Sequence, residues 1–443
     1  MRTPATLQPV SLLTRALTMR RAWVAVRGRL VLAFLCISLL LALPSDGYLG
    51  TARVTFTLNQ AIGRLGFQLA SWEVQALSQK AHDLIARPGA NLRPAQRHDL
   101  VAAYFDAIGR IEELNRQIER IYANPHQSDP QAAAAPLQAE LDLLRAEQAR
   151  RRPAVESILA EQVTDILREV GLTTAGRVWP PVSFQFSASP YYLIVSPRNR
   201  IVLQYGIYLE PELAVEQMEH IEEDVQRRLD VSALVEGTGG FSSYPTMIVE
   251  NPDLEWVLST IAHEWGHTYL AFRPLGWHYA DSGDTRTLNE TVVSILGDEI
   301  ARRVLLRYYP ELVPPADWPR PFSMRTDWWQ RERPPRPFEF GPFMRQTRLH
   351  VDKLLAEGKV TEAEAYMEAQ RQILLEQGYV IRKLNQAYFA FHGSYAVGPA
   401  ATDPIGGKLR ALRRRTESLA EFMQIVSGFT SAADLDAALA RMR

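Results

Sequence analysis

The sequence predicts an α+β fold that is mainly helical and contains one small mixed sheet, and three observations carry this prediction. From about residue 53 to 175, apolar residues recur every three or four positions, which is the period of an amphipathic helix. Between residues 180 and 247, runs such as VSFQF and YYLIV are rich in β-branched and aromatic residues, as strands are. Helical periods then resume, so we expect the sheet to be backed by helices.

Composition and charge exclude several classes of protein. The chain has 443 residues, 49 Lys and Arg against 50 Asp and Glu, and 47% hydrophobic residues. This balance of charge argues against a basic nucleic-acid binder, so no nucleic-acid partner is expected. The apolar fraction excludes wholesale disorder. The only cysteine is Cys36, which excludes a disulfide scaffold and a zinc site built from thiolates.

The N-terminus carries the pattern of a targeting segment. Residues 1–29 contain six arginines and no acidic residue, and an uncharged apolar run follows from Leu30 to Leu43. This order is typical of a signal peptide or a signal anchor. The run is shorter than the roughly 20 residues that span a bilayer. A transmembrane anchor over residues 30–49 and a cleaved signal sequence therefore both stay open, and either one predicts that the later residues lie outside the cytoplasm.

The rest of the chain divides into four segments. The first is expected to be a stalk or packing domain built from a pair of long helices, and a substrate-binding role stays open. Residues 124–130 are dense in turn formers and would join the two helices, while Pro153 would kink or restart the second. The four segments are a helical domain (50–178), a core with the strands (179–313), a connection rich in Pro and Trp (314–342) and a C-terminal helical subdomain (343–443).

Within the core, the expected order is strand, strand, helix, strand, helix. PRNR at 197–200 indicates a hairpin turn, and residues 211–229 have a helical period. Residues 237–249 predict a glycine-rich loop followed by a strand. In the C-terminal subdomain, Gly358 is expected to end one helix of a helix–turn–helix.

The chemistry is concentrated in His-Glu-Trp-Gly-His at residues 263–267, an HExxH pattern. Residues i and i+4 of a helix point to the same side, so His263 and His267 can meet one metal ion. Glu264 then faces the open coordination position, where it can accept a proton from the attacking water. The alternative is a chance match in which both histidines are packed in a core.

The context of the motif favours a helix and a functional site. Asn251 suits an N-cap, Pro252 the first helical position and Asp253 the positive end of the helix, and apolar residues follow at helical spacing. Two histidines and a glutamate buried on such a helix without a partner would be costly. We therefore expect a metal ion there.

A catalytic zinc needs a third protein ligand, and a helix at residues 285–305 with Glu290 near its start offers one. At this point the sequence resembles the gluzincin metallopeptidases, whose pattern is HExxH followed by a helix that carries Asn-Glu. Asn289-Glu290 matches that pattern, and the resemblance covers about residues 240–305. It implies one zinc ion per chain, a zincin-like sheet backed by the motif helix, and a second, ligand-bearing helix.

The resemblance also implies roles for individual residues. The zinc would be held by His263, His267 and Glu290, with Glu264 as the general base. Many gluzincins place an aspartate four residues after the ligand glutamate, to orient the first histidine, but this chain has Ser294 there.

Other polar residues are expected around the ligands. Asp298, one turn beyond Ser294, and Ser294 itself are candidates to orient an imidazole, as is Asn289. Asp298 and Glu299 are also rival third ligands. The loop between the two helices carries three further polar residues that could line the site but are better explained as solvated: His278, Asp281 and Asp284.

Substrate-binding and oxyanion-stabilising groups are also expected. In zincin folds an edge strand before the motif helix pairs with the substrate backbone, and residues 239–249, with Ser243 and Tyr244, stand in that place. Pro245 fits an edge. A donor for the oxyanion should lie downstream, with Tyr395 or His392 as candidates and ordinary packing at a helix end as the alternative.

The prediction is therefore a membrane-associated, extracytoplasmic zinc metallopeptidase that acts on a peptide or protein. One alternative is a metal-dependent hydrolase of a non-peptide amide of the cell envelope. Another is a helical scaffold whose metal site is structural or degenerate, although the intact Glu264 argues against it. The sequence indicates no oligomeric state and does not separate an endopeptidase from an exopeptidase.

Overall fold

The computed structural model describes residues 51–123, 127–211, 213–313, 338–393 and 404–442. The fold is α+β and mainly helical, which confirms the predicted class. The predicted basic segment (1–29), the apolar segment (30–49) and most of the Pro- and Trp-rich connection lie outside the described residues. Within the described ranges, no helix combines the length and the apolar character that a bilayer crossing requires.

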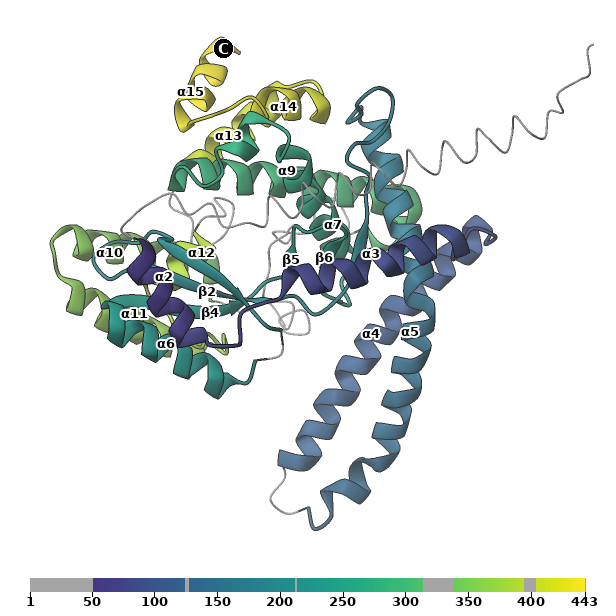
Figure 1. Cartoon of the computed structure of the whole chain (residues 1–443), viewed down its shortest axis with the longest axis horizontal. Coiled ribbons are helices and arrows are strands. Elements are labelled where there is room, and N and C mark those ends of the chain that lie inside the picture. The colour runs from purple at the N-terminus through teal and green to yellow at the C-terminus, as the bar shows by residue number, and fades with distance from the viewer. Residues whose placement is uncertain (1–50, 124–126, 212, 314–337, 394–403, 443) are drawn as a thin grey trace, which may run out of the picture.

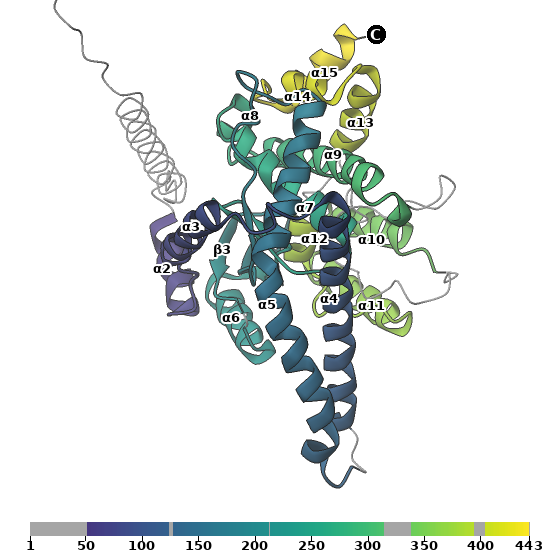
Figure 2. The same cartoon turned by 90° about the vertical axis from the view of Figure 1, so that its right-hand side faces the viewer.

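Two long helices form an arm that projects from the body of the molecule (Figures 1 and 2). Pro153 was predicted to kink or restart the second of these helices, and a restart is excluded because the helix runs through that residue unbroken. Residues 155–167 of this helix lie in the main hydrophobic core, and that packing holds it together although a proline lacks the N–H that a helix interior uses. The helices before the strands are α2 (Thr51–Ile62), α3 (Leu69–Ala86), α4 (Pro94–Ala123) and α5 (Pro130–Glu169).

The strands form two three-stranded sheets rather than the single small sheet that was predicted. The first is mixed, with β1 (Phe184–Phe186) parallel and β5 (Gly240–Phe241) antiparallel to the central β6 (Thr246–Ile248). This sheet backs the motif helix, as expected. The second is antiparallel, in the order β3 (Tyr205–Leu209), β2 (Tyr191–Pro197), β4 (Val231–Gly237).

Strand β4 is absent from the sequence-based prediction. It follows α6 (Val215–Leu229) after the single residue Asp230, whose left-handed φ of 49° turns the chain back. Its residues 232–235 are all buried, so the strand lacks the apolar–polar alternation that marks a half-exposed strand.

The antiparallel sheet is covered on both faces. Alternate residues of β2 and β4 point to opposite sides, so Leu193 and Val235 pack with α2 and α6. Ile194 and Leu234 pack on the other side with α12 (Gln386–His392).

The main core lies between α5, α7 (Leu254–Leu270), α9 (Gly283–Tyr308) and three C-terminal helices. Helices of the N-terminal segment thus share one core with the helices that follow the strands. The C-terminal helices are α13 (Ile405–Arg415), α14 (Leu419–Val426) and α15 (Ala432–Arg441).

Between α9 and α12, α10 (Phe340–Ala356) and α11 (Val360–Glu376) form the predicted helix–turn–helix. Gly358 has a φ of +74° between them, which confirms it as the stop. Two short helices, α8 (Pro274–Trp277) and the 3₁₀ helix η1 (Pro310–Leu312), stand before and after α9.

The motif helix begins two residues later than predicted. Asp253, not Asn251, is the N-cap of α7, and its carboxylate accepts a hydrogen bond from Trp256 N. The Asn251 side chain instead accepts from Asp253 N at 2.8 Å, which turns the chain before the helix. Both residue types are good caps, so the sequence alone favours neither.

Candidate metal centre

Helices α7 and α9 approach each other closely because glycines stand at their contact. A Cβ atom on Gly266 would lie 2.9 Å from side-chain atoms of Val293 and Leu296. A Cβ atom on Gly297 would lie 2.7 Å from the carbonyl oxygen of Ser259. Any larger residue at these two positions would push the helices apart, so both glycines set the distance across which the site forms.

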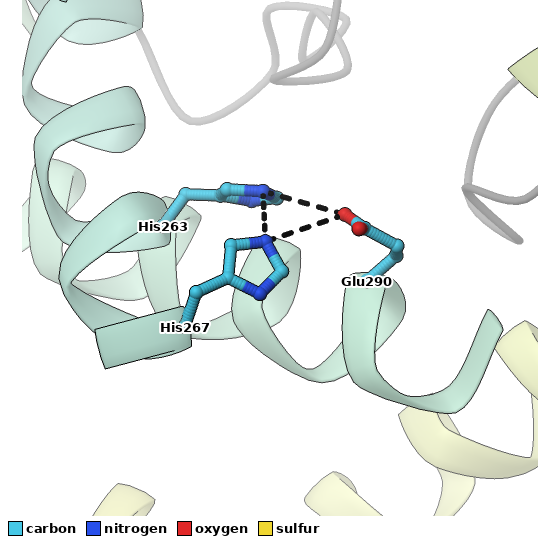
Figure 3. Close-up of side chains that lie close together, drawn as sticks. All are labelled: His263, His267 and Glu290. Atoms are coloured by element: carbon cyan, nitrogen blue, oxygen red, sulfur yellow. Dashed lines mark hydrogen bonds and ion pairs between the residues drawn. The ribbon is translucent and has the colours of Figure 1, made fainter. Parts of the chain in front are cut away.

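The three predicted ligands meet in one buried group. The Nε2 atoms of His263 and His267 lie 3.2 Å apart, and Glu290 Oε2 lies 3.6 Å and 3.5 Å from them (Figure 3). A tetrahedral ion with bonds of about 2.0–2.2 Å holds its ligand atoms roughly 3.3–3.6 Å apart. The three atoms are therefore spaced as a zinc ion requires.

Hydrogen bonds on the far side of each imidazole aim its Nε2 atom at the group. His267 Nδ1 lies 2.9 Å from Asn289 Oδ1, which can only accept, so Nδ1 carries the proton. His263 Nδ1 lies 3.4 Å from Ser294 Oγ, whose own hydroxyl donates to the Glu290 carbonyl oxygen at 2.7 Å. This network leaves the lone pair of each histidine on Nε2, where a metal ion needs it.

The two oxygens of the Glu290 carboxylate have different surroundings. Its Oε1 atom accepts a hydrogen bond from the Tyr279 hydroxyl at 2.6 Å. Its Oε2 atom is buried and has no hydrogen-bond partner among the described residues. A buried carboxylate oxygen without a partner is costly, and this one points at two imidazole nitrogens, so a cation fits the position.

Sequence reasoning missed Tyr279. It lies in the connection between the two helices, next to His278, and its ring stands edge-on to His267 with centroids 6.1 Å apart. In the sequence, the position of Tyr279 in the short connection between the two ligand-bearing helices was the only feature that could have indicated its contact with Glu290.

The charges in the group are coupled. Burial raises the pKa of Glu290, but the two imidazoles outweigh burial and lower it below its usual range. Burial lowers the pKa of His267, but the Glu290 carboxylate outweighs that effect and raises it to about 9. Burial also raises the pKa of Glu264, against the attraction of both histidines. The Glu290 carboxylate is therefore an anion, whose charge favours a positive charge beside it, either a proton on His267 or a metal ion in its place.

Glu264 points from α7 toward the edge strand of the mixed sheet. A Cβ atom on Gly240 of β5 would lie only 2.8 Å from Glu264 Oε1. Ser242, just after β5, donates its hydroxyl to the Glu264 carbonyl oxygen at 3.2 Å. The edge strand thus lies against the expected base.

The prediction that Ser243 and Tyr244 belong to that edge strand is wrong. The edge strand is β5, and both residues lie in the connection to β6, which is the central strand. Ser243 donates its hydroxyl to the Pro245 carbonyl oxygen at 2.8 Å, so it serves the turn. Pro245 immediately precedes β6, the central strand, so it does not lie on an edge strand as predicted.

The rival third ligands have other partners. Glu299 forms a two-point ion pair with Arg413, at 2.6 Å and 3.0 Å, which takes its carboxylate away from the histidines. Asp298 accepts a hydrogen bond from Ser259 Oγ at 3.1 Å and so links α9 to α7 one turn before His263. Among the described residues, the group of potential ligands at this place consists of His263, His267 and Glu290.

The three polar residues of the connection between the helices lie at the surface, as predicted. His278 Nδ1 and Asp281 Oδ2 pair with each other at 2.6 Å on the surface, and Asp284 is exposed in the first turn of α9.

The predicted oxyanion donors are not brought to the metal group by any described contact. His392 packs its ring 4.2 Å from that of Tyr388, and its Nε2 atom lies 3.8 Å from Glu236 Oε1. Burial lowers the pKa of His392 to about 4. Tyr395 lies outside the described residues, so its role stays a prediction.

No protein-family model, no curated protein and no solved structure matches this chain. The chemical capacity of the site follows from its own residues. Two imidazoles and one carboxylate can hold a divalent cation and leave one coordination position free. A second, buried carboxylate, that of Glu264, lies near enough for its pKa to respond to both histidines, and a carboxylate of this kind can accept a proton.

Proposed function

We propose that this protein is a zinc-dependent hydrolase of peptide bonds with a site of the gluzincin type. The observation that supports it most strongly is the spacing of the His263, His267 and Glu290 ligand atoms, at 3.2 Å, 3.5 Å and 3.6 Å. Two histidines and one carboxylate are typical of catalytic zinc sites, whereas structural sites are closed by a fourth protein ligand.

The metal would be held by His263, His267 and Glu290. When bound there, zinc supplies Lewis acidity, which polarises a carbonyl group and lowers the pKa of water. Glu264 is the base that takes a proton from the attacking water and then passes it to the leaving amine.

The surrounding residues keep these groups in place. Asn289 and Ser294 hold the two imidazoles, and Tyr279 holds one oxygen of Glu290 so that the other oxygen faces the histidines. Such supporting hydrogen bonds are typically worth 10–100-fold in metal affinity or activity. The edge strand β5 lies against Glu264, and its free backbone groups suit the extended backbone of a peptide.

The place of action is proposed from the sequence. Six arginines followed by an apolar run predict that the catalytic part is anchored to, or released from, the outer face of a membrane. A reporter enzyme that works only in the cytoplasm, fused after residue 60, should give no signal. A strong signal would contradict the extracytoplasmic assignment.

Metal analysis and a peptide-hydrolysis assay test the activity together. The purified protein should bind one zinc ion per chain and cleave a mixed peptide pool. His263→Ala and Glu290→Ala should each lose zinc and cleavage. Retention of one zinc by both variants would show that the ion binds elsewhere. A zinc-loaded wild type that cleaves no peptide would next be tested on non-peptide amides of the cell envelope. Cleavage of those amides would favour the alternative hydrolase.

A further inference from the structure

Arg286 places a positive charge beside the metal group. It lies on α9 one turn before Glu290, and its guanidinium carbon is 5.6 Å from the centroid of the Tyr279 ring. The hydroxyl of that ring donates to Glu290 Oε1. A single aromatic side chain therefore separates the guanidinium from the ligand carboxylate.

Apart from its contact with the Tyr279 ring, the Arg286 guanidinium has no charged partner among the described residues. No carboxylate forms an ion pair with Arg286 in the part of the chain that the structure describes, and its side chain is half-buried. Glu290 does not serve as its partner, since one oxygen accepts from Tyr279 and the other faces the histidines. A half-buried guanidinium without a carboxylate partner among the described residues, next to a group of potential metal ligands, is suited to a ligand anion.

Two tyrosines of the antiparallel sheet share this electrostatic environment. Tyr192 and Tyr208 are cross-strand partners on β2 and β3, with ring centroids 4.6 Å apart. Burial raises the pKa of Tyr192, Arg286 lowers it and Glu290 raises it further. Loss of solvent around its hydroxyl raises the pKa of Tyr208, although 38% of the residue is exposed, and the charges of Tyr192, Glu264 and Glu290 add to that effect.

The Tyr192 and Tyr208 ring pair also contacts the edge strand. The Tyr208 ring meets the ring of Phe241 on β5 edge-on, with centroids 4.6 Å apart. Phe241 adjoins Gly240, which lies against Glu264. The rings of Tyr192, Tyr208 and Phe241 thus lead, contact by contact, from the antiparallel sheet to the edge strand beside Glu264.

We propose that Arg286 binds a carboxylate group of the substrate close to the bond that is cleaved. The inference rests on the proposed function. The four residues from Arg286 to Glu290 rise about 6 Å along the helix axis, and consecutive Cα atoms of a peptide are 3.8 Å apart. The carboxylate is therefore expected within one or two residues of the scissile bond. It belongs either to a free C-terminus or to an acidic side chain.

Paired substrates separate the two sources of the carboxylate. One pair compares each peptide with a free C-terminus against the same peptide with an amidated C-terminus. The other pair compares Glu-containing peptides with matched Gln peptides, all of them amidated. Mass spectrometry then gives kcat/KM for both members of each pair. The wild type should prefer the carboxylate member of one pair by roughly 10–100-fold, the range for hydrogen bonds to a charged group. The preferred pair identifies the source.

Variants assign the preference to Arg286. Arg286→Gln should remove most of the preference while the protein still binds one zinc. Arg303→Gln is the matched control, since Arg303 is exposed on the same helix, about 25 Å further along its axis. It should keep the wild-type ratio. An unchanged ratio in Arg286→Gln, or an equal loss on both members of each pair, would overturn the proposal.

A binding measurement separates this inference from the proposed activity. Calorimetry on the zinc-loaded Glu264→Gln protein compares N-acetyl-Gly-Phe with its amide, and an N-acetyl-Glu amide with its Gln counterpart. One carboxylate ligand should bind roughly 10–100-fold more tightly, and Arg286→Gln in the same background should abolish the difference. If this holds and the wild type cleaves no peptide, the peptidase proposal fails and the anion site stands. Equal binding within both pairs would overturn the anion site alone.

Discussion

Gly240→Ala tests whether the edge strand holds the expected base in place. The new Cβ atom would lie 2.8 Å from Glu264 Oε1 and 3.1 Å from both Glu264 Cγ and Thr260 Cγ2. Gly240 does not have a left-handed φ, so alanine suits its backbone and space alone is at issue. Ordinary contact begins at 3.4 Å, so the carboxylate or the strand must move by about 0.6 Å.

The size of the effect follows from that displacement. A misplacement of about 1 Å at a reacting group can cost roughly 100-fold in rate. A shift of about 0.6 Å is therefore expected to lower kcat by about 10-fold or more. The zinc ligands lie outside this contact, so one zinc ion per chain should remain bound.

The assay is peptide hydrolysis with zinc content and Tm measured on the same samples. Gly237→Ala is the matched control, since its Cβ atom would lie at an ordinary 3.7 Å from the Tyr191 ring. It should keep the wild-type kcat. A folded, zinc-loaded Gly240→Ala protein with wild-type kcat would refute the argument that β5 positions Glu264.

Three further predictions concern the metal ligands, the residue that orients one of them, and His392 of α12. Asn289→Ala should weaken zinc binding roughly 10–100-fold in a chelator-competition titration, and unchanged affinity would mean that its contact with the imidazole is unimportant. Glu290→Ala should lose zinc, whereas Glu299→Ala should keep it and cost about 1 kcal/mol of stability through its lost ion pair; the reverse ranking would overturn the choice of third ligand. His392 has a folded-state pKa of about 4 against 6.5 when unfolded, so its neutral burial costs increasing stability as the pH falls from 6.5 to 4. Relative to the wild type, His392→Gln should therefore lose less stability over that range in urea titrations, by on the order of 2–3 kcal/mol, and parallel curves would contradict this.

The parts of the site that sequence could predict are those set by local geometry. His263 and His267 are four residues apart on one helix, and a helix places such residues on the same side. Helix geometry alone does not select Glu290 as the third ligand. That choice depended on the Asn-Glu pattern in the following helix. The structure brings all three together because the contacts of α7 and α9 run antiparallel, with His263 beside Ser294 and His267 beside Asn289.

The parts that could not be predicted depend on packing between distant segments. The contact of Gly240 with Glu264 exists only because β5 lies against α7. Tyr279 is one tyrosine among 16, and only the fold shows that its hydroxyl reaches Glu290. Strand β4 is buried on both faces, so it has no alternation to mark it. In each case the decisive partner is not a neighbour in sequence.

The most direct test of the account is the rate of peptide cleavage by the Glu264→Gln protein at full zinc occupancy. Glutamine keeps the size of the side chain and leaves His263, His267 and Glu290 untouched, but it cannot accept the proton. We predict that the variant holds one zinc ion per chain and cleaves the peptide pool roughly 10²–10⁴-fold more slowly than the wild type. A zinc-loaded variant that cleaves at the wild-type rate would contradict the proposed hydrolase mechanism.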